Sequence, residues 1–131
     1  MEEDHALAES IMHSLPENRC FNMTGFTRTL RELFTLFHMV RLLITNDGGP
    51  GQFAVLTPAR VMIFFRPETP TLYGPMIEGA AIFYSHLPCS PCLTAYNHRN
   101  SPCDGNNQCL KSIDVDRVYQ RAVKILNDGD G

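Results

Sequence analysis

The segment Leu43-Ile-Thr-Asn-Asp-Gly-Gly-Pro-Gly-Gln-Phe-Ala54 is the most informative part of this 131-residue chain. Its apolar start predicts a buried strand over residues 41–45, which ends at the turn residues Asn46 and Asp47. The two glycines that follow allow the backbone to turn sharply with positive φ, and Pro50 suits the first turn of a helix. Such a turn exposes N–H groups at the carboxyl edge of a sheet, where ligands of open α/β folds bind.

The rest of the chain alternates between helical and strand patterns. Apolar spacing predicts helices over residues 3–13, after a cap at Thr27 or Thr29, over residues 53–56, and after a cap at Asp114. Strands are predicted over residues 20–23, 61–65 and 80–84. This alternation favours an α/β fold with a parallel sheet and helices on its faces. Because such domains usually open with a strand, we expect one or more strands to be missing before residue 1.

The inner faces of two helices can be read from apolar spacing. The helix after Thr29 is predicted to bury Leu30, Leu33, Phe34 and Phe37, and the helix after Asp114 to bury Val115, Val118, Ala122 and Ile125.

Composition limits the function classes. Residues 1–131 fit one domain, and 44% hydrophobic with 19% charged residues is typical of a globular protein. The net charge of −3 excludes a general nucleic-acid footprint. No apolar run is long enough to span a membrane, and the acidic N-terminus has no signal-peptide pattern, so a cytoplasmic location is expected.

The turn at Asp47 has two interpretations. A diphosphate is the natural ligand, because the backbone N–H groups and the helix N-terminus both favour an anion. Alternatively, Asp47 only caps the helix and the glycines only form a tight turn.

Four cysteines lie close together in a loop predicted over residues 86–110. They are Cys89, Cys92, Cys103 and Cys109, with the spacing C-x2-C-x10-C-x5-C. Four thiolates so spaced can coordinate zinc, whereas unligated or disulfide-paired cysteines are the alternative. An iron–sulfur cluster fits the later spacings less well. Cys20 lies outside the cluster and is predicted to be a core residue in a strand.

A series of motifs resembles glycosyltransferase family 9, which includes the heptosyltransferases. The motifs are Asn-Asp-Gly-Gly-Pro-Gly-Gln-Phe-Ala from residue 46, Phe-Phe-Arg-Pro-Glu-Thr-Pro from residue 64, and Tyr-Gly-Pro from residue 73. In the family, a strand ends in Asp-Ser/Thr/Gly-Gly-Pro-x-His and is followed by a strand, a Phe-Gly-Pro-Thr-x-Pro turn and a later Gly-Pro. The resemblance covers nearly the whole chain and keeps the order of its motifs.

The resemblance implies a Rossmann-like parallel sheet with flanking helices, the C-terminal, nucleotide-sugar-binding half of a GT-B enzyme that is truncated at its N-terminus. It places Asp47, Gly48, Gly49, Pro50 and Gln52 at the diphosphate or sugar. Arg66, Glu68 and Thr69 would form a wall of the cleft, and Glu2 or Glu3 would contact the ribose. Two residues depart from the family pattern, since Gln52 replaces a histidine and Arg66 replaces a glycine.

The implied reaction is metal-independent, inverting transfer of a sugar from an ADP-heptose-like donor to the lipopolysaccharide core. The acceptor and the catalytic base would belong to a missing N-terminal domain, so no catalytic residue is assigned and the isolated chain is expected to be inactive. The full enzyme would be cytoplasmic and peripheral at the inner face of the bacterial inner membrane. The family carries similar cysteines but requires no cofactor. The alternative function is a zinc-binding interaction module derived from a glycosyltransferase, with a structural zinc at the cysteine cluster.

Overall fold

The structure is a computed structural model that describes residues 2–15, 19–65, 70–73, 80–92, 103 and 106–128. The chain divides into two compact units, Met1–Leu36 and Phe37–Gly131.

The first unit contains helix α1 (Glu2–His13) and most of helix α2 (Leu30–Met39). Both helices were predicted, but the inner face predicted for α2 is wrong at Leu30, which lies at the first turn and is 56% exposed. The strand predicted over residues 20–23 is wrong, because Asn22 forms a local turn instead. Its side-chain oxygen accepts a hydrogen bond from the Thr24 N–H at 3.0 Å, and its amide donates to Glu9 at 2.6 Å. Phe21 is 85% exposed, and Cys20 is half-buried rather than a core strand residue.

Helix α2 begins with a capping box. The Thr29 hydroxyl accepts a hydrogen bond from the Glu32 N–H at 3.2 Å, and the Glu32 carboxylate accepts in return from the Thr29 N–H at 3.1 Å and the Arg28 N–H at 2.6 Å. These backbone hydrogen bonds, that from Arg28 first, lower the pKa of Glu32 below its ordinary value of 4.5. The cap predicted at Thr27 or Thr29 is therefore at Thr29.

The cap predicts how the stability of α2 depends on pH. Because the folded pKa of Glu32 lies below the unfolded value, its stabilising effect is present at neutral pH and is lost as the pH falls through the folded pKa. We expect Glu32→Gln to lower the thermal midpoint at pH 7 and to have a smaller effect at pH 3. An NMR titration of the Glu32 carboxyl carbon checks the direction of the shift. Equal effects of the substitution at both pH values would contradict this assignment.

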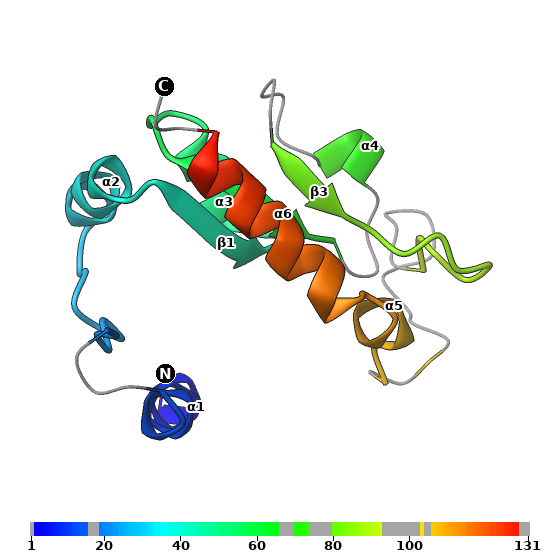
Figure 1. The fold of residues 1–131 in the computed structure, drawn as a ribbon, viewed down its shortest axis with the longest axis horizontal. Helices are drawn as coiled ribbons and strands as arrows, with labels where there is room; N and C mark the ends of the chain where they lie inside the picture. The colour runs from blue at the N-terminus through cyan, green and yellow to red at the C-terminus, as the bar shows by residue number, and fades with distance from the viewer. Residues whose placement is uncertain are drawn as a thin grey trace. The chain divides into compact units, whose positions relative to one another are not determined.

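The second unit is a three-stranded parallel sheet with the strand order β1-β2-β3 (Figure 1). The strands are β1 (Leu42–Asn46), β2 (Arg60–Phe64) and β3 (Ala81–Phe83), and the helices are α3 (Gly49–Ala54), α4 (Pro70–Tyr73), α5 (Gln108–Lys111) and α6 (Val115–Asn127). The predicted α/β, Rossmann-like sheet with flanking helices is confirmed. Helix α3 begins at Gly49, earlier than residues 53–56, and α5 occupies the end of the predicted loop over residues 86–110.

Helices cover both faces of the sheet (Figure 1). On one face, Met62, Ala81 and Phe83 pack with Ile125 of α6. On the other face, α3 packs over Ile63 and Thr45, because side chains alternate between the faces of a strand. Val61, Met62 and Ile63 are each at most 1% exposed, so the strand predicted over residues 61–65 is buried, and the strand order places it at the centre of the sheet.

Strand β1 is less buried than predicted. Within the described part of the chain it pairs only with β2, and Ile44 is 49% exposed. A strand at the edge of a sheet has a neighbour on one side only, which explains the difference.

Helix α6 is anchored at both ends. The Asp114 side chain accepts a hydrogen bond from the Asp116 N–H at 2.9 Å, which confirms the predicted cap. At the other end, the Arg60 guanidinium donates to the carbonyl oxygens of Ile125 at 2.6 Å and Asp128 at 3.4 Å, and Arg41 donates to that of Leu126. The predicted inner face is confirmed except at Val115, which is 78% exposed because it lies at the first turn.

Candidate functional site

The turn after β1 lies at the carboxyl edge of the sheet. The Asp47 N–H donates to the Phe64 carbonyl oxygen at 2.9 Å, which holds the turn against β2. Gly48 is the N-cap of α3 with φ 161° and ψ −174°, and its carbonyl oxygen accepts from the Gln52 N–H at 3.3 Å. The predicted positive φ is wrong for this turn, because Gly48 is extended and α3 begins immediately after it. Among the described glycines, Gly25 is the left-handed one, with φ 74°.

Gly48 and Gly49 leave space above the backbone. A Cβ at Gly48 would lie 3.9 Å from Pro50, and one at Gly49 would lie 3.5 Å from Phe53, both ordinary contacts. Both glycines are exposed. Neither backbone strain nor close packing against the described residues therefore requires glycine at these two positions. Because glycine has no side chain, the backbone here is open to a ligand.

Gly51 has a different role. It is buried, and an added Cβ would lie 2.9 Å from Ile63 Cδ1 and 3.3 Å from Thr45 Cγ2. This glycine lets α3 approach β1 and β2 closely, so that it fixes the position of the turn. The sequence motif contains Gly51, but spacing alone does not reveal which of its glycines the packing requires.

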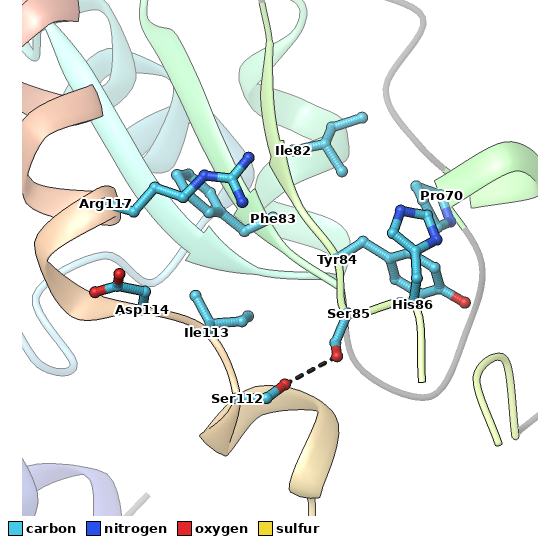
Figure 2. A pocket seen from close by; sticks show the side chains of 10 residues that line it. All are labelled: Pro70, Ile82, Phe83, Tyr84, Ser85, His86, Ser112, Ile113, Asp114 and Arg117. Atoms are coloured by element: carbon cyan, nitrogen blue, oxygen red, sulfur yellow. Dashed lines mark hydrogen bonds between the residues drawn. The ribbon is translucent and has the colours of Figure 1, made fainter. Parts of the chain in front are cut away.

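An open pocket of about 440 Å³ lies at the carboxyl end of β3 (Figure 2). Tyr84, Ser85 and His86 follow β3 and form one side. The opposite side comes from the α5–α6 connection and the start of α6, with Ser112, Asp114 and Arg117 among its residues.

Polar groups meet inside this pocket. The Ser112 hydroxyl donates to the Ser85 hydroxyl at 2.8 Å, and the rings of Tyr84 and His86 meet edge to face with their centroids 5.0 Å apart (Figure 2). Hydroxyl, imidazole and guanidinium groups can all donate hydrogen bonds to sugar hydroxyls or to phosphate. Because the strands are parallel and β2 alone separates β1 from β3, the pocket and the Asp47 turn lie on the same edge, with the two strands about 10 Å apart.

Several predicted site residues lie outside the described residues. These are Arg66, Glu68 and Thr69. Pro70, which directly follows them, lines the pocket at β3. Glu2 and Glu3 form the start of α1, and their side chains are also outside the described residues.

The four cysteines of the cluster differ in burial. Cys109 in α5 is buried, Cys89 is exposed, and Cys92 and Cys103 are half-buried. Among the described residues, which include all four, no three histidine, cysteine, aspartate or glutamate side chains are grouped to hold a metal ion. A structural zinc at this cluster stays a prediction.

Comparison with known proteins identifies the family. The model of glycosyltransferase family 9 (heptosyltransferase) matches residues 1–101. The chain belongs to glycosyltransferase family 9. The match spans more than three quarters of the chain and includes both the turn after β1 and the motif that ends at Pro70. No curated protein and no solved structure matches the chain significantly.

In this family 9 chain, the pocket at the carboxyl end of β3 is lined partly by residues that match the family and partly by residues beyond the match. Tyr84, Ser85 and His86 lie within the match, whereas Ser112 and Arg117 lie beyond it. The rule that ligands bind at carboxyl ends of parallel strands could have indicated the three residues after β3. No sequence signal places Ser112 beside Ser85, because 27 residues separate them. In the parts of the chain that are described, no helix is long and apolar enough to cross a membrane.

Proposed function

We propose that this chain binds the nucleotide-diphosphate sugar donor of a glycosyltransferase at the carboxyl edge of its sheet. The observation that carries the proposal is the turn at Asp47 in a family 9 chain, where two exposed glycines leave the backbone open without any steric need for glycine. Backbone N–H groups and small residues at such an edge suit the close approach of a diphosphate.

Different residues of the turn contact different groups of the donor. Gly48 and Gly49 expose their backbone to the diphosphate, and Asp47 accepts hydrogen bonds from hydroxyl groups of the donor. Gln52, exposed in α3, offers an amide where the family has histidine, so its contact with the ligand carries no charge at any pH. The hydroxyl and imidazole groups of the pocket after β3 bind further polar groups of the donor.

The proposed reaction is inverting sugar transfer from an ADP-heptose-like donor to a lipopolysaccharide-core hydroxyl, without a metal cofactor. Backbone amides stabilise the negative charge that develops on the leaving diphosphate, which is transition-state stabilisation at a preorganised site. We assign no catalytic base to the described residues. In a bacterial cell, the acceptor would place the reaction at the inner face of the inner membrane.

Calorimetric titration with ADP and ADP-sugars tests the donor site. We expect Asp47→Ala and Gly49→Val each to weaken binding at least tenfold, the first by removing a hydrogen-bond acceptor and the second by filling the space above the backbone. Asp128→Ala is the matched control, because Asp128 is an exposed aspartate at the far end of α6, where its backbone carbonyl oxygen accepts a hydrogen bond from Arg60 at the start of β2.

Zinc content measured on the same sample separates the two functions. Nucleotide binding that is lost in both variants and kept in the control supports the donor site. Stoichiometric zinc without nucleotide binding would instead support the cysteine-cluster interaction module. Unchanged affinity in both variants would refute the assignment of the Asp47 turn.

A further inference from the structure

A second groove runs along the outer side of β3, away from the turn at Asp47. Its volume is about 450 Å³. The segment from Ala80 to Phe83 forms one wall, and α6 forms the other. The α6 side chains in the groove are Arg117, Gln120, Arg121 and Lys124, which lie on successive turns of one helix face. Helix α6 lies beyond the residues that match family 9.

The β3 wall of this groove is an edge that can accept another strand. Within the described residues, β3 pairs with β2 alone, and the Phe83 carbonyl oxygen accepts from the Phe65 N–H at 2.8 Å on that side. Peptide groups alternate in direction along a strand, so Ile82 directs its N–H and carbonyl groups to the outer side. Ile82 is 42% exposed. Unpaired backbone groups at a sheet edge are a template for an added strand.

The α6 wall supplies positive charge. Arg117, Arg121 and Lys124 are all exposed, and none forms an ion pair with another described residue. The chain as a whole carries a net charge of −3, so this cationic stripe is a local feature. Four residues of helix advance about 6 Å, while same-face side chains of a strand recur about every 6.6 Å. The four-residue step from Arg117 to Arg121 matches this spacing. The three-residue step from Arg121 to Lys124 advances about 4.5 Å, a difference of about 2 Å that the long side chains of arginine and lysine can span.

We propose that this groove binds an extended peptide segment with acidic residues at alternate positions, which adds to β3 as a fourth strand. The backbone of Ile82 bonds to the added strand, and its carboxylates face Arg121 and Lys124. A second copy of the chain is a poor occupant, because pairing β3 with β3 would bring two cationic stripes together. The cations thus favour an acidic partner and disfavour self-association.

Fluorescence anisotropy with two labelled peptides tests this groove in the full chain. One peptide alternates glutamate and threonine over seven residues, and the other has the same composition with its glutamates contiguous. We expect the alternating peptide to bind at least tenfold more tightly. Arg121→Glu combined with Lys124→Glu should weaken its binding at least tenfold. Arg19→Glu combined with Arg31→Glu makes the same total change of charge at exposed sites elsewhere in the chain, and should change binding less than twofold.

Hydrogen exchange at Ile82 tests the added strand directly. The alternating peptide should slow exchange of the Ile82 amide, and a version methylated at its backbone nitrogens should not. If the charge-reversed variant does not fold, the neutral double variant Arg121→Gln and Lys124→Gln takes its place. Glutamine is a good helix former, and this variant should also weaken binding. Any of four results would overturn the proposal: equal binding of both peptides, displacement of the bound peptide by phosphatidylglycerol vesicles, unchanged hydrogen exchange at the Ile82 amide, or no binding of either peptide.

Discussion

Gly51→Val is expected to lower the free energy of unfolding by about 3 kcal/mol, the upper part of the range for overpacking a buried site. The first added carbon would already lie 2.9 Å from Ile63 Cδ1, and Ile63 is only 1% exposed. Two more methyl groups would have to enter the contact between α3 and the sheet, which cannot expand without moving β1 or β2. Chemical denaturation monitored by circular dichroism measures the loss.

Two matched substitutions show whether packing is the cause. Gly49→Val places the same side chain where a Cβ makes an ordinary contact, 3.5 Å from Phe53, and should change stability by less than about 0.5 kcal/mol. Gly51→Ala should cost about 1 kcal/mol or less, because the terminal methyl of Ile63 is the nearest atom and alanine favours the helix. A stable Gly51→Val protein would show that α3 is not packed as described.

The double substitution of Arg41→Ala and Arg60→Ala should cost about 2–3 kcal/mol. Both guanidinium groups donate hydrogen bonds to carbonyl oxygens at the end of α6, contributed by Ile125, Leu126 and Asp128. Hydrogen bonds from charged groups are worth about 1.5–3 kcal/mol each, and a cation at a helix C-terminus adds a favourable interaction with the helix dipole. The expected loss of stability is smaller than the sum of these contributions because both arginines are exposed to solvent.

Arg117→Ala is the control for this pair, because Arg117 lies near the start of the same helix and should change stability by less than about 0.5 kcal/mol. Thermal unfolding of the three proteins at one pH and salt concentration gives the comparison. If the double variant unfolds at the same temperature as the control, the arginines do not anchor α6.

Much of the fold was predictable because local signals agreed with it. The apolar run of β2, the capping residues Thr29 and Asp114, and the alternation of strands and helices all led to the elements observed. The strand predicted at residues 20–23 failed because an apolar run needs a partner strand, and Asn22 supplies a local turn instead. The burial of β1 was overestimated for a related reason, since periodicity does not reveal which strand lies at an edge.

The candidate site was predictable only in part. The turn at Asp47 stands out because its residues are adjacent in the sequence and its motif is typical of family 9. The pocket after β3 was missed, because it joins Ser85 to Ser112 through the packing of α5 and α6 beside the sheet. The anchoring of α6 by Arg60 was missed in the same way, since 65 residues separate that arginine from Ile125.

The sequence by itself determined the family, the α/β class, the order of the central elements and the turn that we propose as the donor site. These depend on contiguous residues, whose propensities and motifs can be read along the chain. Only the tertiary structure decided that Gly51 rather than Gly48 or Gly49 is required by packing, and that β3 and α6 form a cationic groove. Such features depend on distances between residues far apart in the sequence, and those distances are fixed by the packing of the sheet against its helices.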